Sequence, residues 1–181
     1  MKRISRIKMM TCGLMVFFAA NAPAQSASGT TTLSVVVPAE AALTVTTATT
    51  NMATASTTFG SAFTGSTSVN LKFRTSATTG SGTVTVKITT DFSPTGGPSV
   101  ATPPTAGDAL SYTCSITSSA ACVTGSTTAS TGSATNVVTM GAAKHSANAG
   151  DVATVGWSLT DDPVYAQGTY TATATFTISA S

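Results

Sequence analysis

The chain has 181 residues, a formal net charge of +2 and only 8% charged residues, against about 25% in an ordinary soluble domain. Its eight Lys and Arg residues are too few to form the basic stripe that a nucleic-acid-binding protein needs. Disorder driven by charge is excluded by a hydrophobic content of 41%, which is typical of a chain that buries a core. These values predict a folded protein without a nucleic-acid partner.

Residues 1–24 have the three parts of a secretory signal peptide. Four Lys or Arg residues are followed by an apolar run over residues 9–20. Ala22-Pro23-Ala24 then forms an A-x-A-like cleavage site, which makes Gln25 the expected first mature residue. The apolar run is shorter than the roughly 20 residues that cross a bilayer, and no second such run follows. We therefore expect an exported chain with no transmembrane segment.

Thr and Ser dominate the 157 residues that follow residue 24, with 38 Thr and 22 Ser. Four cations and six anions give this part a net charge of −2. Such a composition fits either a disordered, mucin-like stalk or an antiparallel sheet whose wet face carries Thr. Near the C-terminus, apolar residues alternate with Thr and Ser at Tyr170, Ala172, Ala174, Phe176 and Ile178. Period two is the pattern of a half-buried strand, so it favours the sheet.

The same alternation and the turn residues between the alternating runs predict many short strands and no long helix. We expect strands at 31–37, 40–48, 57–63, 67–75, 82–90, 109–117, 121–125, 134–140, 152–160 and 168–180. Loops are expected at the polar stretches 46–58 and 126–133 and at the Pro- and Gly-rich stretch 93–108. The predicted fold class is all-β: an Ig-like, two-sheet antiparallel β-sandwich over residues 39–181. Residues 25–38 precede it as an N-terminal extension or first strand.

Cys114 and Cys122 are the two cysteines of the expected mature chain, with seven residues between them. An exported protein meets an oxidising compartment, so a disulfide between them is the leading interpretation. The intervening residues read as a tight turn, and we expect the bridge to clip a hairpin. Two free thiols and a metal site are the alternatives, but His145 is the single histidine, which leaves a metal short of ligands.

A Ser-His-Asp arrangement can be drawn from Ser146, His145 and Asp151. All three lie on one short loop, whereas a catalytic triad gathers its side chains from separate elements. The nearest approach to a Gly-x-Ser-x-Gly motif is residues 156–160, which end in Thr160 and so lack the last glycine. We therefore expect a solvated loop histidine, no catalytic residue and no cofactor.

Asp161 and Asp162 precede Pro163, and two acids in this position fit either a turn or part of a calcium site. Asp side chains in turns commonly bond nearby backbone N–H groups, so the turn is the leading interpretation and no metal is expected. Trp157 could serve as a sugar-stacking platform. It shares a strand face with Val155 and Leu159, so we expect it in the core.

Residues 31–37 read TTLSVVV and place Leu33, Val35 and Val37 at alternate positions, with Pro38 ending the run. One interpretation is a first strand that pairs within its own sheet. The other is a detachable strand that completes the sheet of a neighbouring subunit.

The export signal, this apolar N-terminal strand, the Thr-rich alternation and the closing strand from Gly168-Thr169-Tyr170 resemble fimbrial subunits of the chaperone–usher type. They are also similar to spore-coat-protein-U-like secreted domains, which end in a similar Gly-Thr-Tyr strand. In such subunits the N-terminal strand fills a groove left by a missing strand in the next subunit. The resemblance implies that Leu33, Val35 and Val37 insert. One groove wall would then consist of Tyr170, Ala172, Ala174, Phe176 and Ile178.

The function expected from these features is that of an exported structural protein, a fimbrial or coat subunit that assembles with identical copies by strand complementation. The resemblance adds a periplasmic chaperone and an outer-membrane usher as partners. It implies transit through the periplasm to the cell surface or the medium. The alternative is a monomeric secreted binding module for a glycan or a cell-surface protein.

Overall fold

A computed structural model describes residues 27–181 other than residue 55. The signal peptide and cleavage site predicted at residues 1–24 lie outside the described residues. Strands and loops make up the described part, which contains no helix. Accordingly, none of its segments is a helix with the length and apolarity needed to span a membrane. The predicted all-β class is confirmed.

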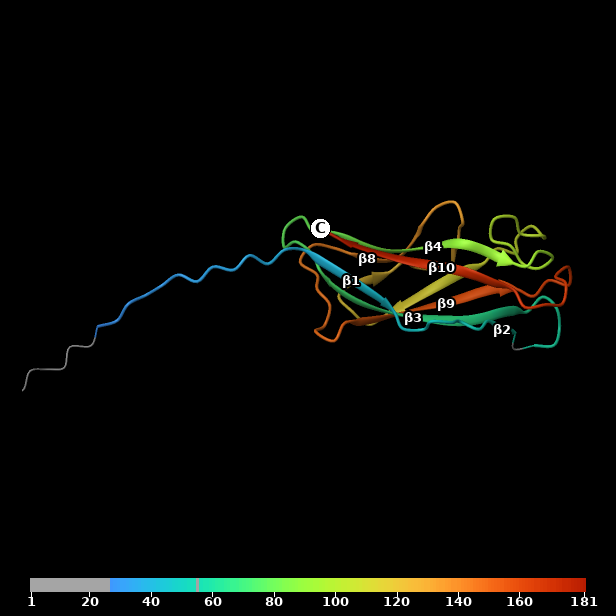
Figure 1. The fold of residues 1–181 in the computed structure, drawn as a ribbon, viewed down its shortest axis with the longest axis horizontal. Coiled ribbons are helices and arrows are strands. Elements are labelled where there is room, and N and C mark those ends of the chain that lie inside the picture. The colour runs from blue at the N-terminus through green and yellow to red at the C-terminus, as the bar shows by residue number, and fades with distance from the viewer. Residues whose placement is uncertain (1–26, 55) are drawn as a thin grey trace, which may run out of the picture. The chain divides into compact units, whose positions relative to one another are not determined.

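Two antiparallel sheets pack around one core (Figure 1). The first sheet has the order β1 (Glu40–Val45), β3 (Ala62–Arg74), β9 (Asp151–Thr160), β5 (Ser111–Ile116) and β7 (Thr127–Thr128), with β2 (Ala53–Thr54) also paired to β3. The second sheet has the order β10 (Thr171–Ala180), β4 (Gly82–Ser93), β8 (Thr135–Met140) and β6 (Ala121–Cys122). The prediction of two antiparallel sheets is therefore correct.

The strand register fixes which residues share an end of the molecule. Glu40 pairs with Arg74, and the Ser76 N–H donates to the Ser181 carbonyl at 3.0 Å. We call this the Ser181 end. At the other end Ala62 pairs with Thr160, and Thr171 pairs with Ser93. We call this the Thr171 end.

Alternating apolar residues from both sheets form the core, as the sequence pattern predicts. Val69 and Leu71 of β3, Val84 and Val86 of β4, and Val155 of β9 are all almost fully buried. The outward faces carry mostly Thr and Ser, because β-branched Thr suits a pleated, solvated surface. Trp157 also lies in the core at 6% exposure, which confirms its predicted packing role.

Three expected strands differ from the structure. Residues 31–37 form no strand. The separate strands expected at 57–63 and 67–75 are wrong, because β3 runs unbroken from Ala62 to Arg74 and residues 57–61 form turns and bends instead of a strand. Thr64-Gly65-Ser66 reads as a break in sequence. In the structure, each of these residues pairs with β9 and Gly65 lies opposite Trp157, so cross-strand pairing outweighs the local turn signal.

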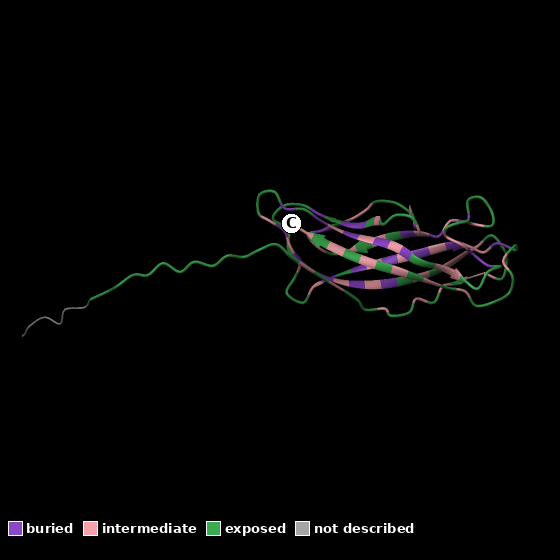
Figure 2. Ribbon diagram, turned by 45° about the horizontal axis from the view of Figure 1, so that its top comes forward, coloured by how far each residue is buried: buried purple, intermediate pink, exposed green. Residues whose placement is uncertain are grey.

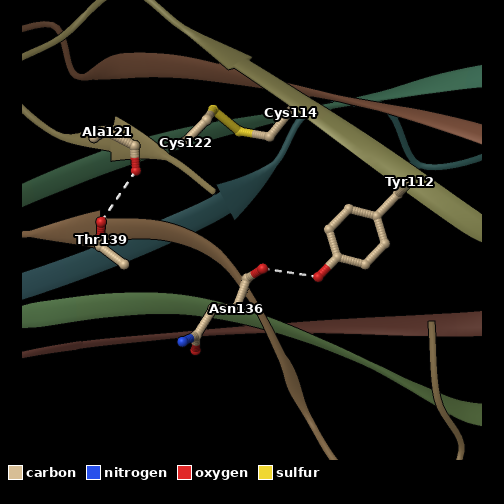
Figure 3. The surroundings of a disulfide bond; sticks show 6 residues. All are labelled: Tyr112, Cys114, Ala121, Cys122, Asn136 and Thr139. Atoms are coloured by element: carbon tan, nitrogen blue, oxygen red, sulfur yellow. Dashed lines mark hydrogen bonds between the residues drawn. A yellow bond between two sulfur atoms is a disulfide. The ribbon is translucent and has the colours of Figure 1, made fainter. Parts of the chain in front are cut away.

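The disulfide joins the two sheets. Cys114 and Cys122 are bridged, as predicted, but the expected hairpin is wrong. Cys114 lies on β5, which pairs with β9 in the first sheet, whereas Cys122 lies on β6, which pairs with β8 in the second (Figure 3). The chain between them crosses from one sheet to the other, and in this crossing the Ser118 hydroxyl donates to the Asp151 carboxylate on β9.

Candidate functional site

A groove of about 850 Å³ opens at the Thr171 end, between the segment that follows β1 and the beginning of β10. We call residues 46–52, which follow β1, the rim segment. Apolar side chains from both sheets reach the groove, and those on the strands are Val45, Phe63, Ile88, Phe92, Trp157, Leu159, Ala172, Ala174 and Phe176. The volume lies in the range of sites that take up a small ligand or several side chains.

Trp157 anchors the floor of the groove. Its indole Nε1–H donates to the Thr67 hydroxyl at 2.9 Å, which satisfies the one polar atom of a buried ring. The ring packs edge-on against Phe176, with centroids 6.5 Å apart, and against Tyr112, at 5.6 Å. The floor is therefore apolar and shared by both sheets.

Threonine hydroxyls hold the rim segment against β3. The Thr46 hydroxyl donates to the Ser68 carbonyl at 3.0 Å, and the Ser68 N–H donates to the Thr47 hydroxyl at 3.1 Å. Further along, the Thr50 and Thr67 hydroxyls lie 2.6 Å apart. β1 pairs with β3 through its backbone, whereas the rim segment relies mainly on side chains. Its path can therefore diverge from β3 and leave the groove open.

Gly65 sets how closely the rim segment approaches. A Cβ at this position would lie 2.8 Å from Thr50 Cγ2 and 2.9 Å from the Asn51 carbonyl oxygen. Any larger residue would push the rim segment away from β3 and widen the groove.

The second wall is β10, whose only partner among the described strands is β4. Its apolar residues are half-buried, whereas those that alternate along β3, β4 and β9 are largely buried. Figure 2 shows this alternation as pink and green bands along the strand. A free edge leaves backbone N–H and C=O groups unpaired, so β10 presents both an apolar face and a hydrogen-bonding edge.

The sequence-predicted wall residues fall into three positions. Ala172, Ala174 and Phe176 line the groove, and Tyr170 lies at its outer end. There the Tyr170 ring rests against Gly97 and Gly168, and its hydroxyl donates to the Ala166 carbonyl at 2.7 Å. Ile178 lies nearer the Ser181 end and packs against the core outside the groove lining.

The predicted donor residues are exposed. Leu33 is 91% exposed, Val35 83% and Val37 57%. Val36, which faces the other way in an extended segment, is 88% exposed. Four large apolar side chains without cover within residues 33–37 form a surface that a folded protein rarely leaves in water.

Two buried carboxyl groups, Asp108 and Asp162, form a pair beside the groove, which Asp162 lines. Asp108 and Asp162 share a hydrogen bond that, together with burial, raises the pKa of Asp108. Hydrogen bonds donated by the Thr105 hydroxyl and the Val164 N–H lower the pKa of Asp162. Burial and the surrounding carboxylates raise the pKa of Tyr165, which also lines the groove, to about 12. The pair holds the loop after β4 to the turn after β9.

Asp162 begins the predicted turn, in which the Val164 N–H donates to the Asp162 carboxylate at 2.8 Å, whereas the Asp161 backbone bonds to Gly60 and Ser61. Within residues 27–181, leaving aside residue 55, no group of three His, Cys, Asp or Glu side chains is arranged to hold a metal ion.

His145, Ser146 and Asp151 have separate partners. His145 is exposed and its Nδ1 lies 3.2 Å from the Ser146 carbonyl oxygen. The Ser146 hydroxyl accepts a hydrogen bond from the Phe73 N–H, and the Asp151 carboxylate accepts one from the Ala147 N–H. In each of these contacts the partner is a backbone group and not the side chain of another member of the three.

The rim segment is the part of the groove that sequence reasoning missed, since residues 46–58 read as a polar loop. No local sequence pattern marks it, because its position depends on contacts between distant residues, such as the hydroxyl pair of Thr50 and Thr67, seventeen residues apart. No family model, curated protein or solved structure matches the chain. The geometry itself describes an apolar groove beside an unpaired strand edge, which suits an extended apolar segment.

Proposed function

We propose that this protein is an exported structural surface subunit, of fimbrial or coat type, that assembles with identical copies by strand complementation. One observation carries the proposal: β10 has a free edge and a half-buried apolar face beside a groove. The same chain also carries an exposed apolar segment with the matching alternation. We call residues 31–37 the donor segment.

The strand order supports an Ig-like interpretation of the two sheets. An Ig constant-type sandwich has strands in the order A-B-E-D in one sheet and C-F-G in the other. β1, β3, β9 and β5 match A, B, E and D in both sheet order and chain order, while β4 and β10 match C and F. The position of strand G lies beside β10, and no described strand occupies it. An incoming strand would complete the sandwich there.

Strand addition uses both features of this site. Main-chain hydrogen bonds to the free edge of β10 supply affinity, and pockets for alternate side chains supply specificity. Leu33, Val35 and Val37 would face the groove, and Ser34 and Val36 would face solvent. A groove of this kind needs cover during export, so the proposal includes a periplasmic chaperone and an outer-membrane usher as further partners.

A pair of substitutions in the donor segment tests the proposal. Val35→Asp places a charge on the face that inserts, whereas Val36→Asp places the same charge on the opposite face. Both side chains are more than 80% exposed in the free chain, so neither change should alter its stability. Burying an unpaired carboxylate in place of a valine should weaken assembly by about 100-fold or more. Light scattering and electron microscopy of the chain from Gln25 onward measure the extent of assembly.

We expect fibres or oligomers from the parent chain and from Val36→Asp, and monomers from Val35→Asp with unchanged circular dichroism. Equal assembly of the two variants would contradict strand insertion. A parent chain that stays monomeric and binds a glycan or a cell-surface protein would favour the alternative of a monomeric binding module.

A further inference from the structure

Aromatic side chains gather around the groove. Seven of the nine Phe, Tyr and Trp residues in the described part of the chain line it, and the other two are Phe73 and Tyr112. Phe59 is 70% exposed at the Thr171 end, so its ring is accessible from solvent. So many rings around a concave volume of about 850 Å³ are typical of a site that takes up a small molecule with an apolar body.

Polar groups meet these rings at the outer end of the groove. The Gly60 N–H donates to the Asp161 carbonyl at 2.9 Å, and the Asp161 N–H donates to the Ser61 carbonyl at 2.7 Å. These bonds join the turn before β3 to the turn after β9. In that second turn the Tyr165 N–H donates to the Asp162 carbonyl at 3.0 Å. Four side chains that line the groove here form what we call the tip cluster: Phe59, Asp161, Asp162 and Tyr165.

The tip cluster carries negative charge that no described cation balances. Among the described residues that line the groove, Asp161 and Asp162 are acidic and none is Lys, Arg or His. Buried Asp108 adds a third carboxyl, which hydrogen-bonds to Asp162. The described cations lie elsewhere: Lys72, Arg74 and Lys144 at the Ser181 end, and Lys87 on the outer face of β4. A ligand that enters this end of the groove therefore gains from a positive charge.

Tyr165 also lacks a partner. Its hydroxyl oxygen is buried and has no hydrogen-bond partner among the described residues, which is rare in folded proteins and points to a partner that binds from outside. Burial and the surrounding carboxylates raise the pKa of Tyr165 to about 12, so the group is a neutral phenol whose oxygen accepts a hydrogen bond. With the carboxylates of Asp161 and Asp162 it offers three acceptors, which matches the three N–H donors of a primary ammonium group.

We propose that the tip cluster binds a small primary amine, whose ammonium group contacts Asp161, Asp162 and Tyr165 and whose apolar body packs on the aromatic rings of the groove. Aromatic faces attract a cation as well as apolar surface, so both halves of such a ligand are matched. The described residues form no group of three metal ligands, whereas an ammonium group needs no fixed coordination geometry.

The inference goes beyond the proposed function and does not rest on it. All four residues of the tip cluster lie outside β10, whose edge would receive a strand. Light scattering of the samples used for the binding measurements reports assembly separately, so either proposal can fail without the other.

Three ligands with one apolar body test the proposal. Phenethylamine is protonated at pH 7 and has three N–H donors, its trimethylammonium analogue keeps the charge without donors, and phenethyl alcohol is neutral. Isothermal titration calorimetry with the chain from Gln25 onward measures each Kd. We expect the amine to bind about tenfold more tightly than the trimethylammonium analogue and about 100-fold more tightly than the alcohol. Equal affinities for the amine and the alcohol, or no binding of the amine at millimolar concentration, would overturn the proposal.

A matched pair of charge changes locates the site. Asp161→Asn should weaken binding of phenethylamine about tenfold, because a charged acceptor is lost, and should leave binding of the alcohol unchanged. Glu40→Gln makes the same change in net charge on a side chain that is 75% exposed at the Ser181 end, and it should alter neither affinity. An equal loss in both variants would show that net charge alone attracts the amine, which contradicts a site at the tip cluster.

Tyr165→Phe separates a ligand contact from a structural role. The hydroxyl has no partner in the free protein, so its removal should not lower the free energy of unfolding in urea. Binding of phenethylamine should nevertheless weaken about fivefold, while binding of its trimethylammonium analogue, which has no N–H to donate, should not change. A variant that loses stability and keeps its affinity for the amine would refute the role given to Tyr165 and, with it, the proposed site.

Discussion

The two sheets meet along two seams, and the seams are closed differently. Where β5 and β6 meet, the Cys114–Cys122 disulfide links the sheets covalently. The Tyr112 hydroxyl adds a second link by donating to the Asn136 carbonyl on β8 at 2.8 Å (Figure 3). Where β1 and β10 meet, the described residues form no covalent link, and the seam opens into the groove at the Thr171 end.

The difference indicates at which seam the two sheets can separate. A covalent link keeps one seam from opening, so the sheets can separate only at the other, where contacts are apolar packing and hydroxyl hydrogen bonds. If the groove accepts a strand, the disulfide-linked seam keeps the two sheets together while the other seam opens. Removing the disulfide from one seam and hydrogen bonds from the other should therefore have distinct effects on stability and on assembly.

The largest expected effect follows from removing the disulfide. The paired change Cys114→Ser with Cys122→Ser frees a short closed loop and should lower the free energy of unfolding by about 2–3 kcal/mol. Urea unfolding followed by Trp157 fluorescence measures the loss, since Trp157 is the one tryptophan. Reducing agent should lower the parent to the same value and leave the variant unchanged. A parent that reductant does not affect would contradict the role given to the bridge.

The next effect lies at the open seam. Thr67→Val removes the acceptor of the Trp157 N–H and the partner of the Thr50 hydroxyl. A buried donor without a partner costs about 1–3 kcal/mol, and the rim segment loses one of its fastenings. Thr67→Ser keeps the hydroxyl and should recover most of the loss. Thr64→Val, at an exposed position of the same strand, is the matched control and should be close to neutral. Equal losses for Thr67→Val and Thr67→Ser would mean that packing, not the hydrogen bond, matters.

Sequence reasoning located most strands because burial repeats every second residue. The alternation from Tyr170 to Ile178 marked β10, and Val84-Val86-Ile88 marked β4. Such a pattern tells which face of a strand is buried, but not which strand lies beside it. The crossing between Cys114 and Cys122 was therefore missed, because a hairpin and a change of sheet have the same short polar connection.

Only part of the groove could be predicted from the sequence, because alternation marks the buried face of a strand but not the contacts of a loop. Its β10 wall follows from alternation, and the exposed donor segment follows from the run of apolar residues before Pro38. The rim segment has no apolar period. Its position depends on hydroxyl pairs such as Thr50 with Thr67, seventeen residues apart, and on Gly65, whose missing side chain admits it. Contacts of this kind between distant residues leave no local pattern.

The smallest expected effect concerns Asp91, which fastens the loop beside the start of β10. Its carboxylate accepts hydrogen bonds from the Phe92, Val100 and Ala101 N–H groups and from the Ser99 hydroxyl. Burial raises the pKa of Asp91, but these four hydrogen bonds outweigh burial and leave the pKa below its ordinary value of 3.8. The folded state therefore favours the ionised carboxylate.

Asp91→Asn replaces one accepting oxygen with a donor and should cost about 1 kcal/mol at pH 7. Because the folded pKa is depressed, the stability that the carboxylate contributes is fully present above the unfolded pKa, near 4. It is lost as pH falls through the lower folded value. The difference in unfolding free energy between parent and Asp91→Asn should thus shrink below pH 4. Urea unfolding at pH 7, 4 and 3 measures it. A difference that stays constant over this range would show that Asp91 fastens the open seam through shape alone and not through its charge.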